Sequence, residues 1–273
     1  MILIDKNVKH AYHINETFSF CGIRSSLWDS DGTGLFYLHQ TSPLTMIIYS
    51  EETTRKHEIV KIKELNSSIA IVFSGVHDKS YPADLVIGKS QNVKSIDQFE
   101  AMVYPLYFPE QIQEDDEDLG IVSLTDGLDQ NTFSCIGDIV EVMIKHKTKM
   151  FGDVTVRIPN YLGRLRNTQR AWAVRNSKIY IDLEGTLWPS AAYYGNRVLS
   201  FSKKKLPVDT FHNGETLDKL IDEEQTYSIA DLKKTLQNKT SFDMCESIIL
   251  AFGNQELANT IQQAKKSVVK KDI

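Results

Sequence analysis

Short apolar runs dominate the first hundred residues of the chain. Six runs are rich in β-branched and aromatic side chains and are separated by Gly, Pro, Asn and Ser; they occupy residues 18–28, 34–40, 44–50, 57–65, 67–75 and 83–88. Such side chains are typical of strands in a half-buried sheet. The pattern predicts six strands, two of which would form a hairpin around the turn Asp29–Gly34.

Helical patterns become frequent further along the chain. Capping-box spacing predicts helix starts at Ser95, Ser228 and Thr240, since each is followed three residues later by Gln or Asp. Apolar residues recur with helical period over residues 131–147, and residues 161–174 also suggest a helix or helical turn. Between these segments, three short strands are expected, at residues 153–159, 177–185 and 197–203.

Strands gathered early and helices gathered late favour the α+β class. The expected architecture is a β-rich N-terminal half, as an antiparallel sheet, sandwich or barrel, then a mixed middle and a helical C-terminal region. The expected domains are a β-rich domain at 1–109, an acidic boundary loop at 110–120, a mixed segment at 121–210 and a helical region at 211–273, which could continue the preceding part. The boundary loop rests on five consecutive acids, Glu114–Asp118, which repel one another and stay hydrated.

Composition restricts the class of protein. Charged residues make up 25% of the chain and apolar residues 41%, which is ordinary for a globular protein. No run reaches the 18 or so apolar residues that a membrane span needs. Cys21, Cys135 and Cys245 are far apart, which favours reduced thiols in a cytoplasm-like compartment over a disulfide framework or a zinc site.

The stretch Ile179–Ser190, IYIDLEGTLWPS, contains the first candidate for chemistry. It resembles the first motif of the haloacid dehalogenase family of phosphatases, in which an apolar strand ends in Asp-x-Asp-Gly-Thr. The resemblance implies Asp182 as a nucleophile in a Mg²⁺-dependent phosphoesterase, with Glu184 beside it. The alternative is an ordinary strand and turn, and we favour it because the later motifs of that family have no counterpart downstream.

Other motifs are incomplete. Asp29–Gly34 matches the first half of an EF-hand loop, but the twelfth position is Gln40 instead of an acid. The chain has no Walker loop, no GxSxG elbow and no HExxH. The sequence therefore predicts no cofactor and no metal site.

Charge is distributed unevenly along the chain. Between Lys145 and Lys205 there are thirteen Lys and Arg against three Asp and Glu, in a chain with a net charge of −5. Such asymmetry suggests an anionic partner or a charged assembly interface. Ten residues form the predicted basic and aromatic binding surface: Arg157, Tyr161, Arg164, Arg166, Arg170, Trp172, Arg175, Lys203, Lys204 and Lys205.

The sequence thus predicts a non-enzymatic assembly or binding protein. Its basic segment at 145–205 would contact an acidic subunit surface or nucleic acid, or pair with the acidic half of its own chain. The expected setting is the cytoplasm, or a virion if the protein is a viral structural or accessory component, with subunits of an oligomer as partners and no membrane. The phosphoesterase with Asp182 as nucleophile remains the alternative.

Overall fold

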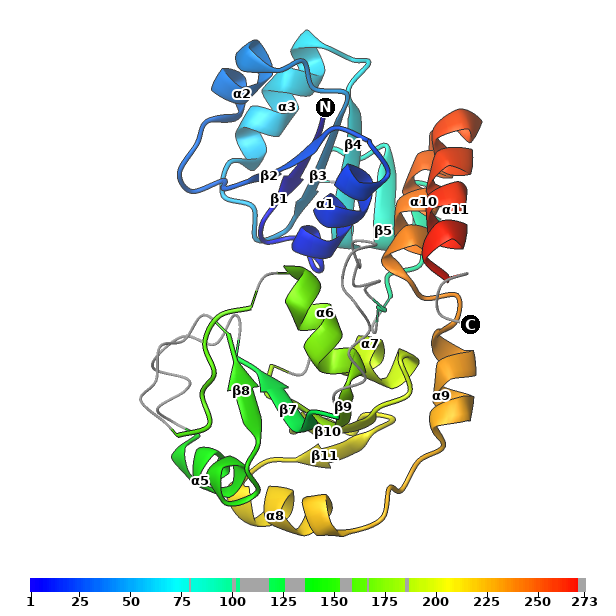
Figure 1. Ribbon diagram of the computed structural model, residues 1–273. Coiled ribbons are helices and arrows are strands. Elements are labelled where there is room, and N and C mark those ends of the chain that lie inside the picture. Colours follow the sequence, from blue (N-terminus) through cyan, green and yellow to red (C-terminus); the bar gives the residue numbers. More distant parts are fainter. Residues whose placement is uncertain are drawn as a thin grey trace. The chain divides into compact units, whose positions relative to one another are not determined.

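A computed structural model of the 273-residue chain divides into two compact units (Figure 1). The structure describes residues 1–78, 80–99, 102–103, 118–125, 136–152, 159–165, 167–184 and 187–269. Unit 1 comprises Met1–Glu100 together with Ser241–Ile273, and unit 2 comprises Ala101–Thr240. Unit 2 is therefore an insertion within unit 1 along the chain.

Unit 1 contains a six-stranded sheet in the order β2-β1-β3-β4-β5-β6, and every pairing is parallel. The strands are β1 (Ile2–Asp5), β2 (Ser25–Trp28), β3 (Met46–Ser50), β4 (Ala70–Val76), β5 (Leu85–Lys89) and β6 (Ser95–Ile96). The helices are α1 (Ala11–Phe20), α2 (Leu35–Thr41), α3 (Lys56–Leu65), α10 (Ser241–Ala251) and α11 (Gln255–Val269). The inner strands are buried on both faces, so they appear in the sequence as continuous apolar runs.

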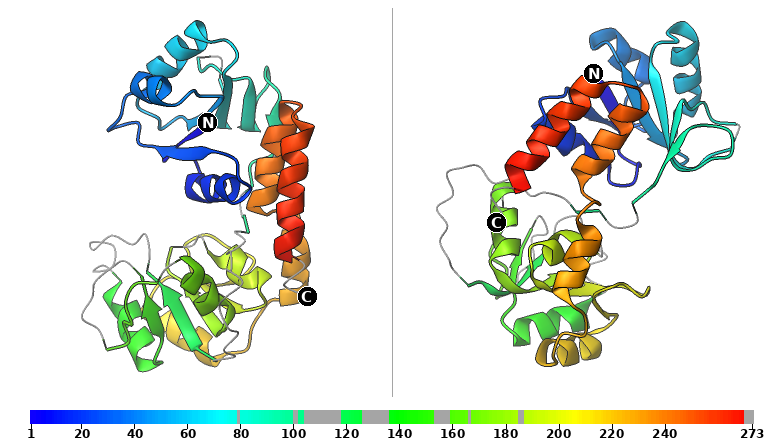
Figure 2. Two further views of the ribbon diagram at one scale, coloured as in Figure 1. Left: turned by 45° about the horizontal axis from the view of Figure 1, so that its top comes forward. Right: turned by 90° about the vertical axis from the view of Figure 1, so that its right-hand side faces the viewer.

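The helices of unit 1 cover both faces of its sheet. Leu35 of α2 and Ile59 and Ile62 of α3 join the buried cluster around Leu3, Ile47 and Phe73, while α1 lies on the other face (Figure 1). The last two helices lie side by side (Figure 2), and α10 packs against α1. The Thr17 hydroxyl donates to Ser241 Oγ over 2.6 Å, and the Cys245 thiol contacts the Ile14 carbonyl at 3.7 Å. Helices α10 and α11 thus belong to the same compact unit as the first hundred residues.

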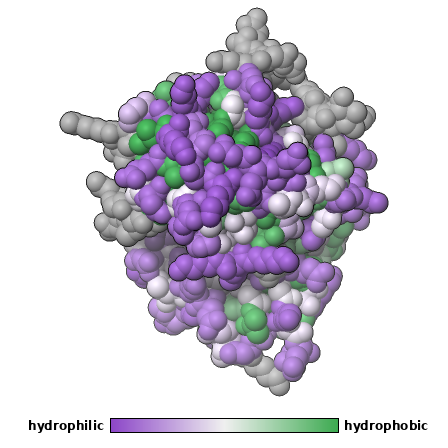
Figure 3. All heavy atoms as spheres, turned by 90° about the horizontal axis from the view of Figure 1, so that it is seen from below, coloured by the Kyte–Doolittle hydropathy of each residue, from purple (hydrophilic) through white to green (hydrophobic). Residues whose placement is uncertain are grey.

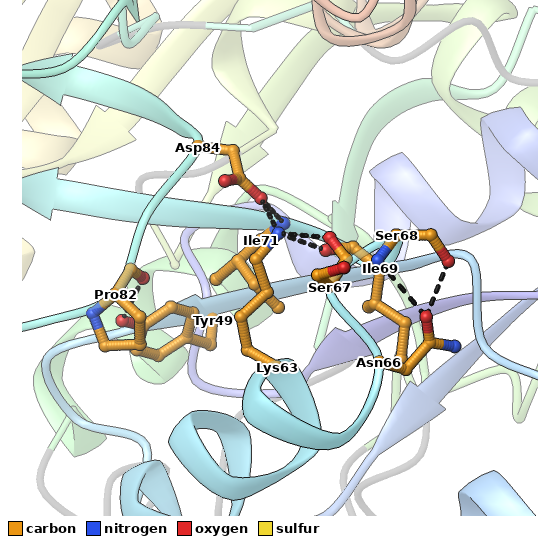
Figure 4. Close-up of polar contacts among 9 residues, drawn as sticks. All are labelled: Tyr49, Lys63, Asn66, Ser67, Ser68, Ile69, Ile71, Pro82 and Asp84. Atoms are coloured by element: carbon orange, nitrogen blue, oxygen red, sulfur yellow. Dashed lines mark hydrogen bonds and ion pairs between the residues drawn. The ribbon is translucent and has the colours of Figure 1, made fainter.

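Short loops replace helices at two parallel connections of unit 1, from β4 to β5 and from β5 to β6. Polar contacts join the end of the β4–β5 loop to the loop between α3 and β4 (Figure 4). Lys63 Nζ of α3 donates to the carbonyls of Ser67 and Ile69 at 3.0 and 2.8 Å, and lies 2.8 Å from Asp84 Oδ2. Tyr49 of β3 is buried, and its hydroxyl donates to the carbonyl of Pro82 in the β4–β5 loop at 2.7 Å. These contacts hold the sheet together where no crossover helix covers it.

Unit 2 contains a five-stranded sheet in the order β11-β10-β9-β7-β8, again entirely parallel. Its strands are β7 (Gly120–Leu124), β8 (Lys149–Phe151), β9 (Ser177–Asp182), β10 (Arg197–Phe201) and β11 (Asp209–Phe211). Its helices are α5 (Gly137–Lys145), α6 (Asn167–Arg175), α7 (Trp188–Tyr193), α8 (Gly214–Asp222) and α9 (Ile229–Leu236). Helices α5 and α8 bury side chains on one face, whereas α6, α7 and α9 cover the other.

The α+β prediction is wrong: the described strands form two parallel sheets of the doubly wound α/β type, with no antiparallel sheet, sandwich or barrel among them. Two of the predicted N-terminal strands are helical, because the runs 34–40 and 57–65 form α2 and α3. The run 18–28 is divided between the end of α1 and strand β2. The predicted hairpin at Asp29–Gly34 is instead the connection from β2 to α2. The expected helix at 95–103 is wrong as well, since β6 occupies its first residues.

Several local predictions are confirmed. Strands β9 and β10 lie within the predicted segments, α5 lies within 131–147, and Ser228 caps α9 by accepting from the Asp231 amide over 3.2 Å. The acidic boundary loop at 110–120 falls outside the described residues except for Asp118–Gly120, as does the strand at 153–159 except for Pro159.

Candidate functional site

Doubly wound sheets bind ligands beyond the carboxyl ends of their strands, at the point where the strand order reverses. In unit 2 this point lies at β7, because the next two strands along the chain, β8 and β9, lie on opposite sides of β7 in the sheet. The connecting helices α5 and α6 lie on opposite faces of the sheet. The side chains that follow β7, β8 and β9 are therefore the first candidates for a site.

Thr125 and Asp182 lie at this edge. The Thr125 backbone amide and its hydroxyl both donate to the Phe151 carbonyl, at 2.7 and 3.0 Å, so the ends of β7 and β8 are tied together. Asp182, the last residue of β9, is 1% exposed, and its Oδ2 accepts the Trp188 amide over 2.8 Å. A carboxylate bonded to a backbone amide fixes the turn from β9 into α7.

A second buried polar side chain accompanies Asp182. Ser200 of β10 pairs with Asp182 in register, so both side chains project from the same face of the sheet. Ser200 is 0% exposed, and its hydroxyl has no hydrogen-bond partner within the described part of the chain. The two residues place a carboxylate and a hydroxyl under α7.

The structure separates the ten residues of the predicted binding surface. Arg164 is exposed and comes between β8 and α6, and Lys203–Lys205 are exposed directly after β10, where Ser202 Oγ accepts the Lys204 amide over 3.0 Å. Four positively charged side chains thus follow the carboxyl ends of two strands. The amino end of α6 points toward the same edge, and helix amino ends favour anions. The first amide of α8 already donates to the Asp138 carboxylate over 2.6 Å.

The other members of the predicted surface have different positions. Tyr161 donates its hydroxyl to the Gly152 carbonyl at 2.7 Å, and Trp172 packs against the buried cluster of α6 and α7. Arg170 is half-buried within α6, whereas Arg175 ends that helix with its guanidinium 5.5 Å from the centre of the Tyr194 ring. Arg157 and Arg166 lie outside the described residues. Glu184 is half-buried beyond β9 and has an interaction partner.

Unit 1 has its own reversal of strand order at β1, between β2 and β3. Asp5 ends β1 at 0% exposure, and its Oδ1 accepts the Asn7 amide over 2.7 Å. A few residues on, His10 precedes α1 in the left-handed region, with φ 66° and ψ 20°. Its Nε2 lies 3.4 Å from the Phe99 carbonyl. A non-glycine residue in this region is uncommon, and such residues gather at functional sites.

Metal and membrane sites are not indicated by the described residues. No three His, Cys, Asp or Glu side chains among them are grouped closely enough to hold a metal ion. Within the same residues, no helix is both long and apolar enough to cross a bilayer. On the face drawn in Figure 3, hydrophilic side chains predominate and the apolar ones are scattered among them. That distribution is typical of a surface in contact with water.

Comparison with known proteins gives the fold. No family model and no curated protein sequence matches the chain. Among solved structures, Staphylococcus aureus MnaA in complex with UDP matches with a TM-score of 0.56 at 10% identity, over 93% of this chain and 97% of that one. The glycosyltransferase SnogD from Streptomyces nogalater matches with a TM-score of 0.50 at 8% identity, over 91% of this chain and 98% of that one. The two doubly wound units are thus those of the Rossmann-like GT-B fold.

These similarities correct the functional predictions. The expectation of a non-enzymatic assembly protein, and of a viral structural component, is contradicted because the chain shares its fold with a glycosyltransferase and a UDP-binding protein. The phosphoesterase alternative is likewise unsupported, and Asp182 instead holds the Trp188 amide in the turn after β9. The expected oligomeric partners and nucleic acid stay predictions.

Sequence reasoning missed Thr125, Asp5 and His10 as candidates. The run Ile2–Asp5 contains the available signal, because a fully apolar run that ends in Asp and is followed by a helix is typical of a βα unit. At the sequence level this run was too short to suggest more than an apolar start.

Proposed function

We propose that the protein is an enzyme acting on a nucleoside-diphosphate sugar, with glycosyl transfer to an acceptor hydroxyl as its reaction. The nucleotide would bind at the carboxyl edge of the unit 2 sheet. The observation that carries this proposal is the pair of doubly wound parallel units, each with polar residues where its strand order reverses. The likeness to a UDP complex and to a glycosyltransferase supports the same reading of the fold.

The charges at the unit 2 edge suit a diphosphate. Glycosyl transfer breaks the bond between the anomeric carbon and the diphosphate, so negative charge develops on the leaving oxygen. Arg164, Lys203 and Lys204 supply positive charge at this edge, and the amino end of α6 supplies amide dipoles. Their attraction to the leaving diphosphate is larger in the transition state than in the bound sugar nucleotide, which is the requirement for catalysis.

An acceptor hydroxyl needs a base, and His10 of unit 1 is the candidate. Its imidazole is half-buried at the amino end of α1, and histidine is the side chain that most often serves as a general base. Because a carbonyl oxygen only accepts hydrogen bonds, the contact to the Phe99 carbonyl places the proton on Nε2.

Nucleotide binding tests the first part of this proposal. Calorimetric titration with UDP, dTDP, GDP and ADP should show binding of at least one nucleotide, and the K203Q/K204Q double variant should weaken it about tenfold, or about 1.4 kcal/mol. The matched control is Lys178→Gln, because Lys178 is an exposed lysine at the opposite, amino end of β9. Absence of binding to all four nucleotides, or equal loss in the control, would refute the proposed site.

Turnover tests the second part. The preferred nucleotide should be released from its glucose and N-acetylglucosamine conjugates in the presence of a mixture of acceptor alcohols, as measured by ³¹P NMR. His10→Gln should abolish this release while leaving the nucleotide affinity unchanged, because His10 belongs to unit 1. Full activity in His10→Gln would remove its role as the base.

A further inference from the structure

The loop between β1 and α1 places His10 and is itself held by buried groups. The Val8 amide donates to the Asp5 carbonyl at 3.0 Å, and the Ala11 amide donates to the Val8 carbonyl at 3.0 Å, so two successive turns lead from the strand to the helix. Val8 is 3% exposed and anchors the midpoint of the loop in the core. The route from Asp5 to His10 is therefore short and fixed at its centre.

Two side chains hold the first turn. Asp5 Oδ1 accepts the Asn7 amide over 2.7 Å, and the hydroxyl of Ser50, at the end of β3, donates to the Asn7 carbonyl at 3.3 Å. Asn7 itself is exposed, so its backbone has water as an alternative partner. The buried carboxylate and hydroxyl instead bind both its amide and its carbonyl. Both residues lie at the reversal of strand order in unit 1.

Burial of Asp5 at this position lowers the stability of the folded state. Asp5 is 0% exposed, and its second oxygen, Oδ2, has no hydrogen-bond partner among the described residues. A buried acceptor without a partner destabilises the folded state, and an asparagine could accept the same amide without the charge. Buried polar groups that are costly for stability are commonly retained for function.

We propose that Asp5 is a positioning residue: with Ser50 it binds Asn7 and fixes the β1–α1 loop, which keeps His10 in its left-handed conformation at the start of α1. Asp5 is fully buried, so it acts through the loop and does not touch a substrate. The left-handed backbone of His10 is unfavourable for a residue with a Cβ and persists only because the loop on either side determines it. A role of this loop in catalysis rests on the proposed function. The hydrogen bonds that hold the loop do not depend on it.

The imidazole of His10 reports on the loop directly. Two-bond ¹H–¹⁵N correlation spectra at pH 8 distinguish the two neutral tautomers, and His10→Gln assigns the His10 signals among the seven histidines. The wild type should show the Nε2–H tautomer, consistent with the contact to the Phe99 carbonyl. Asp5→Ala should give a mixture of tautomers, because the Asn7 amide loses its acceptor and the loop gains conformational freedom.

Two further variants separate the hydrogen bond from the charge and from nonspecific effects. Asp5→Asn keeps an oxygen acceptor, so it should retain the wild-type tautomer and melt at the same or a higher temperature. Asp29→Asn is the matched control, because Asp29 is an exposed carboxylate on the neighbouring loop that pairs with Lys6 at 3.2 Å. It should leave the His10 signals unchanged. Wild-type His10 signals in a folded Asp5→Ala variant would overturn the proposal.

If Asp5→Ala does not fold, the Ser50→Ala variant tests the proposal instead. It removes only the hydroxyl that donates to the Asn7 carbonyl, and it should move the His10 signals in the direction of a tautomer mixture. Unchanged His10 signals would refute the proposal. Where turnover is detected, the Asp5→Ala or Ser50→Ala variant should lower kcat at unchanged nucleotide affinity. If the wild type turns over no sugar nucleotide, the proposed function fails, while the tautomer spectra still decide the role of Asp5.

Discussion

Replacement of Asp182 tests how the turn after β9 is held. Its carboxylate is 1% exposed and accepts the Trp188 amide over 2.8 Å. Asp182→Ala leaves that buried amide without its acceptor, and the loss of a hydrogen bond to a charged group costs about 1.5–3 kcal/mol. For a unit of this size the melting temperature should fall by roughly 5–10 °C. Asp182→Asn keeps an oxygen for the amide and should lose only about a third of that stability, or about 0.5–1 kcal/mol.

Urea denaturation followed by far-ultraviolet circular dichroism measures these differences. Tryptophan fluorescence adds a local probe, because Trp188 begins α7 directly at the site of the change and is itself buried. Ser202→Ala is a suitable control, since its hydroxyl lies in the exposed loop after β10. If Asp182→Ala is as stable as the wild type, the carboxylate does not hold the turn and this explanation of its burial is wrong.

Three further predictions concern other parts of the fold. Gly88→Ala should destabilise unit 1 by about 3 kcal/mol or more, because a Cβ would lie 2.2 Å from the Gly75 carbonyl oxygen at φ 137°; thermal unfolding measures it, and a loss below about 1 kcal/mol would contradict the close approach. The hydrogen bond from Lys145 lowers the pKa of Asp218, so the stabilisation is complete above the ordinary carboxyl pKa and is lost as the pH falls through the lowered one. The stability difference between the wild type and Asp218→Asn should therefore shrink in acid titrations from about pH 5 downward, and a constant difference would contradict this. Lys63→Met should cost about 1 kcal/mol in urea denaturation, because two carbonyls and a half-exposed carboxylate lose a shared donor, and an unchanged midpoint would show that water replaces it.

Local structure was predictable where the sequence pattern is unambiguous. The cap at Ser228, the amphipathic α5 and the strands β9 and β10 follow from short-range rules of spacing and periodicity. Two helices of unit 1 were mistaken for strands because they are rich in aromatic and β-branched residues, as in LFYLHQT of α2 and KHEIVKIKEL of α3. Tertiary packing against the sheet overrides such propensities.

The parallel arrangement could not be derived from these runs. A strand buried on both faces has the same short apolar pattern whether its neighbours run parallel or antiparallel, and pairing joins residues far apart, such as Ile2 with Met46. The candidate sites depend on the same long-range order. Asp182 was recognised as a carboxylate at a strand end, but Ser200 and Thr125 gain their meaning only from the position of β9 beside β7 and β10.

The interrupted order of unit 1 has a consequence for synthesis on the ribosome. All residues of unit 2 emerge before Ser241, so this sheet can fold while the first hundred residues still lack α10 and α11. Until then, the face of α1 that α10 covers is exposed to water or to a chaperone. A premature stop after residue 240 would thus leave unit 2 whole. It would leave unit 1, whose first hundred residues are synthesised earlier, without the helix that covers α1.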